Sequence, residues 1–388
     1  MISAVLYGES LRTTNTQVAD PQDIEFVKAT KRAFDITGAL TTNPLEKITG
    51  SDLYQEFMVN MDKTFTFGAE RTKEKVQSAI NIKNKHSRNG PSSAAAAGEE
   101  STPNKGEEGS SGCPMTALKA TLSGNGGQQP KKERFRDMKI PSNYLNPSYI
   151  ERLVNREKLS ASQITESVAP LLMAGVDTTA YVMSWFYLNM ASNPDIQTKL
   201  ATELHKTLGG ADVMTLEQME SLTYLKACFR ESHRLTPPAS ISVKSIEEEI
   251  DLAIGDKFYR VPPAQRISLN LRGLPMDPNY VSDPHSFIPE RFSAEAIAAR
   301  KGTPSEIALD HPYMNDPFGR GKRRCLGANV AVAEMTVLAA RLLQDWEISL
   351  VDPNEAVQSP TKTWKKTQKL MLIAEPYPAM KLVPRNLQ

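Results

Sequence analysis

Hydrophobic and polar positions follow a helical spacing over much of the chain. Residues 19–87 predict helices with polar faces, interrupted near Gly38–Ser51, where Thr, Asn, Pro and Gly give turn and N-cap signals. Ser160 and Asn193–Pro194 are suitable helix starts, because serine caps a first turn and proline fits the first helical position. Further helices are predicted at 147–158, 161–191, 194–207 and 215–236.

Short β-prone runs replace the helical pattern between residues 239 and 270. SISVKSI, KFYRVP and RISLNL are separated by turn residues and predict a small sheet. A proline-rich stretch from Pro275 to Phe292 follows, and a last long helix is expected from Cys325 to about Trp346. ISLV and KLMLIAEP predict a terminal strand pair. The chain is therefore expected to be mainly α with a small β region.

Residues 88–130 differ in composition from the rest of the chain. They are rich in Gly, Ser, Ala, Pro and charged residues, and cannot bury enough apolar surface to offset the entropy of ordering. We expect a disordered low-complexity insertion within a single domain that otherwise extends over residues 1–388.

The stretch from Val168 to Ala191 is long and apolar enough to be a membrane span. Asp177, Thr178 and Thr179 lie at its middle, where a charged group in a bilayer is costly. A helix that is apolar on all sides is also expected in the core of a large soluble domain. The sequence favours this second interpretation.

Charge and cysteine content exclude several classes of protein. In 388 residues, 46 Lys and Arg balance 45 Asp and Glu, so the formal net charge of +1 does not favour a nucleic-acid partner. Cys113, Cys228 and Cys325 form no CxxC pair, which indicates neither a disulfide framework nor a structural zinc site. Cys228 is expected to act as a small buried hydrophobic residue.

The segment PFGRGKRRCLGANVAVAEM carries the strongest chemical signal. Five of its positions fit the pattern FxxGxRxCxG, namely Phe318, Gly321, Arg323, Cys325 and Gly327. A thiolate that binds iron needs a tight loop, which Gly319 and Gly321 permit, and a cysteine that opens a helix gains from the positive end of the dipole. Gly327 lets the helix approach a flat cofactor, and Arg323 offers a bidentate donor for a carboxylate.

This segment resembles the cysteine-ligand loop of the cytochrome P-450 family. The resemblance covers residues 3 to 385 apart from the insertion, and it implies the mainly α fold of that family with haem b as cofactor. It implies that Cys325 is the axial ligand of the haem iron. Lys244 stands where the family usually carries an arginine that binds a haem propionate, and lysine lacks the bidentate fork. The implied haem contacts are Phe318, Gly319, Arg323, Gly327 and Lys244.

Two further segments follow in the order that the family has them. Glu231 and Arg234 in FRESHRL match the ExxR helix and share one helical face, although pairs at this spacing are common on protein surfaces. FIPERF downstream supplies Arg291. The resemblance implies a buried network of Glu231, Arg234 and Arg291 that holds the loop presenting Cys325.

Ala174, Gly175, Asp177, Thr178 and Thr179 match the AGxDTT motif of the family's central helix. Gly175 leaves room for dioxygen beside the helix, Thr178 can hold a water molecule there, and Asp177 can supply protons for O–O cleavage. The alternative is that the Thr178 hydroxyl merely donates to the carbonyl of Ala174.

Thiolate ligation favours O–O cleavage because sulfur donates electron density to iron. The resemblance thus implies that one oxygen atom of O₂ enters a lipophilic substrate, with two electrons from a redox partner. Similarity to the mitochondrial type implies a sterol or related terpenoid. The alternative is a truncated, catalytically silent haem-binding or regulatory isoform, and retention of Asp177 and Thr178 argues against it. Family members that rearrange peroxides without a reductase typically lack this acid–alcohol pair.

LKACFRE places Lys226 and Arg230 four residues apart on one helical face. In the mitochondrial type this face docks an acidic [2Fe–2S] ferredoxin, and Arg320 and Lys322 would extend the basic patch; charge complementarity speeds and orients such encounters. A flavoprotein reductase is the other electron donor, and a solvated basic helix edge is the simpler interpretation. The resemblance also implies a peripheral position at the mitochondrial inner membrane.

The chain departs from the family at its front. The family's early helices, including one that binds a haem propionate through Trp and Arg, have no counterpart in the sequence. MISAVLYGES lacks the basic start and apolar run of a signal peptide, so we expect no targeting segment or membrane anchor in this chain. The fold is expected to be incomplete at its N-terminus.

Overall fold

The computed structural model describes residues 20–42, 50–88, 148–156, 159–211, 213–368 and 371–385. The chain divides into two units, Met1–Ile80 with Ser148–Gln388, and Asn81–Pro147. The second unit is described only over the last residues of one helix. The insertion predicted at 88–130 lies outside the described residues from position 89 onward, and so does Cys113.

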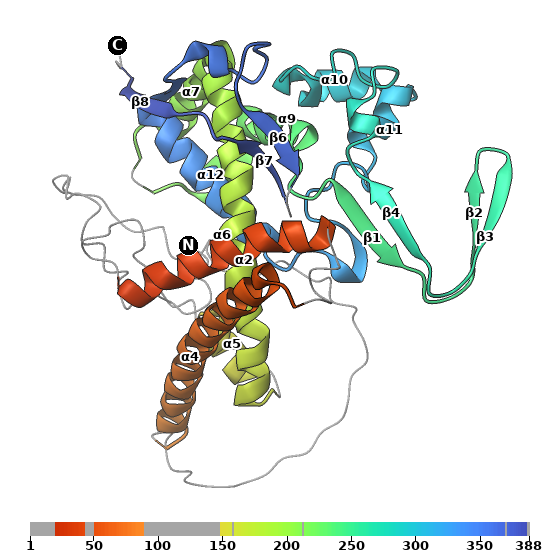
Figure 1. The fold of residues 1–388 in the computed structure, drawn as a ribbon. Helices are drawn as coiled ribbons and strands as arrows, with labels where there is room; N and C mark the ends of the chain where they lie inside the picture. The colour runs from red at the N-terminus through yellow and green to blue at the C-terminus, as the bar shows by residue number, and fades with distance from the viewer. Residues whose placement is uncertain are drawn as a thin grey trace, which may run out of the picture. The chain divides into compact units, whose positions relative to one another are not determined.

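Helices dominate the first unit (Figure 1). Its described α-helices are α2 (Pro21–Thr42), α4 (Asp52–Arg88, which continues into the second unit), α5 (Tyr149–Arg156), α6 (Ala161–Ser192), α7 (Pro194–Leu208), α8 (Leu216–Ser221), α9 (Thr223–Leu235), α10 (Ala294–Ala299), α11 (Pro304–Asp310) and α12 (Ala328–Asp345). Short 3₁₀ turns include η2 (Leu274–Met276), η3 (Pro289–Phe292), η4 (Gly321–Arg323) and η5 (Pro353–Glu355).

Local sequence signals set several helix ends. The Ser160 side chain accepts from the backbone N–H of Gln163, whose side chain in turn accepts from the backbone of Ser160, so a capping box starts α6 as predicted. Pro194 opens α7, and Gly209 ends it in the left-handed conformation. The single helix predicted at 215–236 is wrong. Leu222 leaves helical geometry and buries its side chain fully, which separates α8 from α9.

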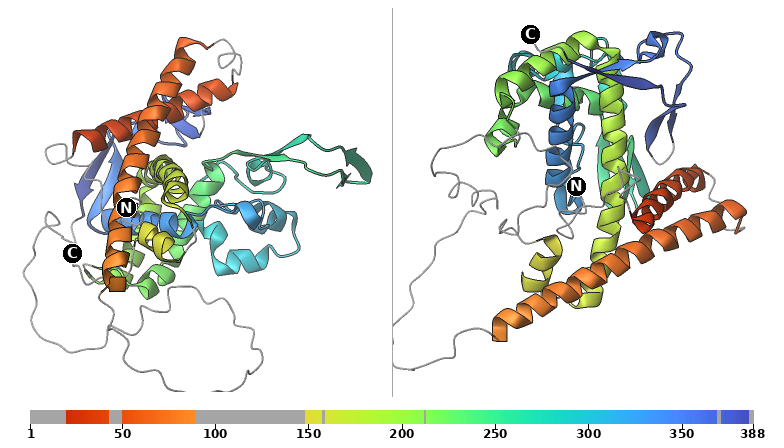
Figure 2. Two further views of the ribbon diagram at one scale, coloured as in Figure 1. Left: turned by 90° about the horizontal axis from the view of Figure 1, so that it is seen from below. Right: turned by 90° about the vertical axis from the view of Figure 1, so that its left-hand side faces the viewer.

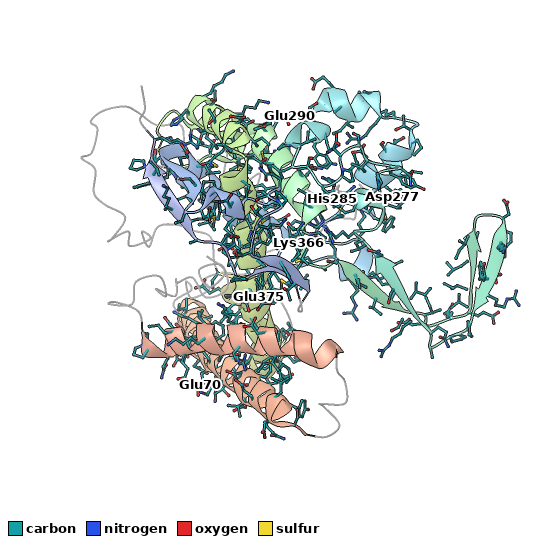
Figure 3. All side chains as sticks on the ribbon, turned by 45° about the horizontal axis from the view of Figure 1, so that its top comes forward. Glu70, Asp277, His285, Glu290, Lys366 and Glu375 are labelled. Carbon is teal, nitrogen blue, oxygen red and sulfur yellow. The ribbon has the colours of Figure 1, made fainter. Side chains whose placement is uncertain are left out.

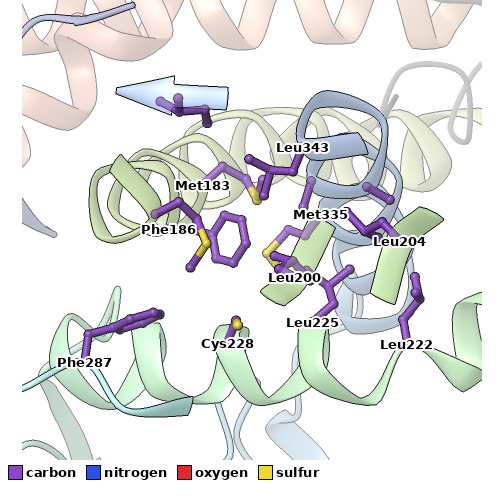
Figure 4. Packing of buried hydrophobic residues seen from close by; sticks show 14 of the residues in the cluster. Met183, Phe186, Leu200, Leu204, Leu222, Leu225, Cys228, Phe287, Met335 and Leu343 are labelled. Atoms are coloured by element: carbon purple, nitrogen blue, oxygen red, sulfur yellow. The ribbon is translucent and has the colours of Figure 1, made fainter. Parts of the chain in front are cut away.

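The central helix α6 lies in the core of the first unit. Its C-terminal half packs with α7, α9 and α12 in a cluster that includes Met183, Phe186 and the fully buried Cys228 (Figure 4). Its N-terminal half packs in a second cluster with Phe26 of α2. The figures show α6 and α12 side by side (Figure 2), in agreement with their contacts. Among the described residues, no helix combines the length and apolarity that crossing a bilayer requires.

The strands form four antiparallel pairs rather than the small sheet predicted between 239 and 270. β1 (Ile241–Ser245) pairs with β4 (Arg266–Asn270), and β2 (Ile250–Ile254) pairs with β3 (Lys257–Val261). The sequence analysis did not predict the strand β2, because its run IDLAI directly follows acidic residues that are typical of a turn. An isolated two-stranded ribbon is only marginally stable in water. Most side chains of these four strands are exposed.

The predicted terminal strand pair is also wrong in its partners. The ISLV run forms β5 (Trp346–Leu350), which pairs with β8 (Met380–Pro384). β6 (Lys365–Gln368) pairs instead with β7 (Leu372–Glu375), which comes from the KLMLIAEP run. Trp185 of α6 donates from Nε1 to the carbonyl of Leu372 at 2.7 Å, which anchors the β6–β7 ribbon to the core.

Candidate functional site

The loop before α12 presents Cys325 at the surface. Its thiol is free and exposed, and its backbone N–H donates to the carbonyl of Phe318 at 2.9 Å. Gly319 and Gly321 have φ values of +68° and +77°, a region that only glycine enters without strain. The helix α12 begins at Ala328 with Gly327 as its N-cap, so the predicted start at Cys325 is three residues early. Cys325 therefore precedes the first turn of α12.

Gly327 has a different role in the loop from the other two glycines. Its φ of −83° suits any residue, and an ideal Cβ there would lie 3.9 Å from the Sγ atom of Cys325, an ordinary contact. The protein's own packing thus does not require glycine at this position. Among the described residues, no other atom is recorded within 4 Å of such a Cβ.

The surroundings of Cys325 combine apolar exposure with positive charge. Leu326 is 81% exposed, and single exposed apolar side chains are common on protein surfaces. Lys322, Arg323 and Arg324 are exposed in the same loop. Phe318 packs against the main core cluster and so fixes one end of the loop. The loop thus presents an exposed apolar side chain beside three exposed cations.

The helix α9 carries a buried ionic network. The Glu231 carboxylate is fully buried and accepts two hydrogen bonds of 2.8 Å from Arg234, whose side chain is also fully buried. Arg291 of η3 adds a third contact at 3.3 Å, and the backbone N–H of Ile288 a fourth at 2.9 Å. The structure thus brings Glu231, Arg234 and Arg291 together.

Arg234 extends this network into the proline-rich segment. Its guanidinium donates to the carbonyls of Pro275, Pro284 and Ser286 at 2.9, 2.6 and 3.1 Å. Arg291 likewise donates to the carbonyl of Asp283 at 2.9 Å. Guanidinium groups suit this task because their donors form a rigid planar fork. Residues 275–291, which have little regular structure, are therefore held against α9.

The middle of α6 contains a second unusual carboxylate. Asp177 is 8% exposed, and its Oδ2 atom has no hydrogen-bond partner among the described residues. Burial and the nearby negative charge of Asp35 raise the pKa of Asp177 to about 6, although Lys31 acts in the opposite direction. Tyr181, one turn further along α6, has its pKa raised to about 12 by burial and by Asp35 and Asp177. Asp177 is poised to exchange a proton near neutral pH.

Thr178 forms the hydrogen bond to its own helix that the alternative interpretation of this residue predicts. Its hydroxyl donates to the carbonyl of Ala174 at 2.8 Å. A hydroxyl that donates in this way still has lone pairs that can accept from water. Gly175 is half-buried on the same helix, and Lys244 lies exposed on β1.

Lys226 and Arg230 both lie on α9 and differ in their contacts. Lys226 is exposed, and its Nζ donates to the carbonyl of Glu220 at 2.6 Å. Arg230 is 4.2 Å from the centroid of the Phe292 ring and contacts Asp310 at 3.4 Å. Arg320, near the Cys325 loop, donates to the carbonyl of Pro312. Arg230 thus has a structural role in addition to its surface charge.

Comparison with known proteins identifies the family. A family model described as Cytochrome P450 matches residues 128–379 of the chain. The chain belongs to the cytochrome P450 family. P450 proteins hold haem b through a cysteine thiolate, and the Cys325 loop has the free thiol, the glycines and the apolar and cationic surface that fit this group.

Individual relatives of this P450 come from several groups of organisms. The Oryctolagus cuniculus protein "Sterol 26-hydroxylase, mitochondrial" is 31% identical over 211 residues, which cover 54% of this chain and 38% of that protein. Cytochrome P450 4V2 of Rattus norvegicus is 31% identical over 53% of the chain and 38% of its own length. Cytochrome P450 71B37 of Arabidopsis thaliana is 28% identical over 58% and 44%. The matched part spans about two fifths of these relatives.

Some residues that influence the candidate site residues could not be found from the P450 motifs. Asp35 and Lys31 on α2 influence Asp177 electrostatically, yet they lie more than 140 positions away in the sequence and in no motif. Phe292 and Asp310, which contact Arg230, lie more than 60 positions from it in the sequence. A sequence pattern reports spacing along one element, and these contacts depend on how separate elements pack.

The buried P450 network can be tested through its central carboxylate. Glu231→Gln removes the negative charge while Arg234 and Arg291 stay buried, so we expect the free energy of unfolding to fall by about 3–5 kcal/mol. Urea denaturation followed by circular dichroism measures this loss. The control is Glu56→Gln, which removes the same charge from an exposed pair with Arg32 and should change stability little. Equal losses for the two variants would contradict the network.

The raised pKa of Asp177 predicts a pH-dependent effect on stability. Between about pH 4 and 6 this carboxyl ionises in the unfolded chain while the folded protein still holds the proton, so the stability of the fold decreases as pH rises. Asp177→Asn should therefore gain stability relative to the natural chain over this interval, on the order of 2 kcal/mol. Denaturation curves at several pH values measure the difference. A difference that does not vary with pH would contradict the prediction.

Proposed function

We propose that the protein is a haem-dependent monooxygenase that inserts one oxygen atom of O₂ into a lipophilic organic substrate. Cys325 is the axial ligand of the haem iron. The observation that carries this proposal is the free, exposed Cys325 thiol in a loop that two left-handed glycines shape, immediately before α12. When bound, a haem with thiolate ligation supplies the activation of dioxygen that this reaction needs.

Each residue near the loop has a separate proposed task. Phe318 fixes the loop to the core, and Gly319 allows its turn. Gly327 leaves space for the ring system beside the sulfur. Arg323 and Lys244 are exposed cations suited to the propionates, with arginine the better donor because of its bidentate fork. The Glu231, Arg234 and Arg291 network is proposed to hold the segment that supports this loop.

Asp177 and Thr178 are proposed to handle protons at the substrate face. The unpaired Oδ2 atom of Asp177 can take up a proton near neutral pH because burial disfavours its charged form. The Thr178 hydroxyl donates to Ala174 and can accept from a water molecule beside it. Gly175 adds no side chain between these two residues and the oxygen site.

The similarity to a mitochondrial sterol 26-hydroxylase supports a sterol-like substrate and a ferredoxin donor. We propose that Lys226 and Arg230 on α9 form the docking face for an acidic [2Fe–2S] ferredoxin, with Arg320 and Lys322 at its edge. A flavoprotein reductase is the other class of donor that a test must separate. On the same similarity we propose a peripheral position at the mitochondrial inner membrane.

Thiolate ligation can be tested with two matched cysteine variants of the haem-loaded protein. In the reduced state with carbon monoxide, the natural chain should show the red-shifted Soret band that a thiolate ligand gives. Cys325→Ala should lose this band, because Cys325 is the proposed ligand, whereas Cys228→Ala should keep it, because Cys228 is buried in the core. A band retained in Cys325→Ala would refute the assignment.

The identity of the electron donor can be tested by charge reversal at Lys226. Lys226 is chosen over Arg230 because Arg230 also packs on Phe292 and its replacement would disturb the fold. Turnover with an acidic ferredoxin at low salt should fall about tenfold in Lys226→Glu, and the loss should shrink as salt rises. Lys206→Glu makes the same charge change at another exposed position on α7 and should have little effect. Unchanged turnover in Lys226→Glu, or support by a flavoprotein reductase alone, would reject the ferredoxin.

A further inference from the structure

A tight turn over residues 316–319 opens the Cys325 loop. The backbone N–H of Gly319 donates to the carbonyl of Asp316 at 3.3 Å, which closes the turn. Aspartate, proline and glycine occupy the first, second and fourth positions, where such turns favour them. The Asp316 carboxylate adds a bond of its own, because its Oδ1 atom accepts the backbone N–H of Phe318 at 3.0 Å. The side chain of Asp316 thus fixes the peptide group that precedes Phe318.

Phe318 connects this turn to the cysteine. Its carbonyl accepts the backbone N–H of Cys325 at 2.9 Å, and its side chain packs against the main core cluster. Phe318 is therefore bonded to Asp316 through its N–H and to Cys325 through its carbonyl. Rotation of the Phe318 backbone would move this carbonyl and weaken its bond to Cys325. The Asp316 side chain thus influences the position of the cysteine through two hydrogen bonds in series.

Arg320 holds the same stretch from its other end. Its Nε atom lies 3.3 Å from the Oδ2 atom of Asp316 and donates to the carbonyl of Pro312 at 3.1 Å. The Arg320 side chain is 48% exposed, whereas that of Asp316 is 18% exposed. An ion pair with a solvent-exposed partner contributes little to stability. We therefore expect the hydrogen bond from Phe318 to matter more than the charge of Asp316.

The carboxylate of Asp316 also lies near α9. Burial lowers the pKa of His233 to about 4, and the negative charge of Asp316 acts in the opposite direction. His233 stands on α9 between Glu231 and Arg234, the central pair of the buried network. The turn at Asp316 is therefore close to the helix that carries this network.

Similar turns elsewhere in the chain show what is particular to Asp316. Asp277, which is labelled in Figure 3, and Asp352 each precede a proline and accept the backbone N–H two residues on, at 2.8 and 2.9 Å. Each also accepts the backbone N–H three residues on through its carbonyl. Of these turns, the one at Asp316 contains Phe318, to which Cys325 donates. The same local geometry thus acts on the cysteine only at Asp316.

We propose that Asp316 is a positioning residue for the thiolate of Cys325 and acts through the backbone of Phe318. This inference rests on the proposed function, which gives Cys325 its role as the iron ligand. A carboxylate is a strong acceptor for a backbone N–H, so its removal frees the Phe318 peptide group to rotate. The side chain of asparagine offers an oxygen acceptor at the same place without the charge, and alanine offers none.

The first test measures hydrogen exchange at the Cys325 amide in the full chain without haem. Asp316→Ala should raise the exchange rate about tenfold, because losing a hydrogen bond to a charged acceptor shifts local opening by that order. Asp316→Asn should stay within about twofold of the natural chain, since the ion pair that it loses is partly exposed. Asp352→Ala removes the matched acceptor from the turn after β5 and should leave the Cys325 rate unchanged. An unchanged rate in Asp316→Ala would overturn the proposal.

The second test follows the thiolate Soret band of the haem-loaded chain in the reduced state with carbon monoxide. The band should decay about tenfold faster in Asp316→Ala than in the natural chain, and Asp316→Asn should restore its lifetime. Thermal melting of each variant shows whether the whole fold is weakened. A merely structural turn would lower the melting temperature in Asp316→Ala and Asp352→Ala alike and leave the band equally long-lived in both, which would overturn the proposal.

The two tests separate the role of Asp316 from the proposed function. Absence of the thiolate band in the natural chain would refute the function, and the exchange rate at Cys325 would still decide whether Asp316 holds the loop. A thiolate band that has the natural lifetime in Asp316→Ala would refute the positioning role and leave the function standing.

Discussion

The buried Glu231 carboxylate is the interaction on which the rest of the site depends. It is a full negative charge without solvent, and it is tolerable only because Arg234, Arg291 and a backbone N–H surround it. Those arginines use their remaining donors on carbonyls of the segment 275–291. A stretch with almost no regular secondary structure thus acquires a fixed path, and it leads into the helices that precede the Cys325 loop.

Two of the buried carboxylates on helices of the first unit, Glu231 and Asp177, differ in their surroundings. Glu231 accepts from Arg234, from Arg291 and from the backbone N–H of Ile288, whereas one oxygen of Asp177 has no donor among the described residues. The first arrangement fixes a charge permanently, and the second leaves protonation in balance near neutral pH. Solvation and hydrogen bonding therefore give the two groups different protonation behaviour, although both are simple carboxylic acids.

The sequence alone predicted features that lie within one helix. It did not predict features that depend on how separate elements pack, such as strand partners. The bounds of α6, its Ser160 cap and the shared face of Glu231 and Arg234 follow from spacing within a helix. Strand partners do not, since ISLV pairs with a strand more than 25 residues away, not with the predicted run. The break at Leu222 also needed the tertiary structure, because burial of one leucine outweighs the helical pattern around it. The influence of Asp35 on Asp177 is a packing effect of the same kind.

The three glycines around Cys325 matter to the protein for different physical reasons. Any other residue at Gly319 or Gly321 strains the backbone, so such changes reduce the amount of folded protein in a cell. Alanine at Gly327 meets only an ordinary contact and no strain, so the chain would accumulate normally. Changes at Gly319 or Gly321 would then appear as low abundance, whereas under its proposed role a change at Gly327 would leave abundant protein that binds haem poorly.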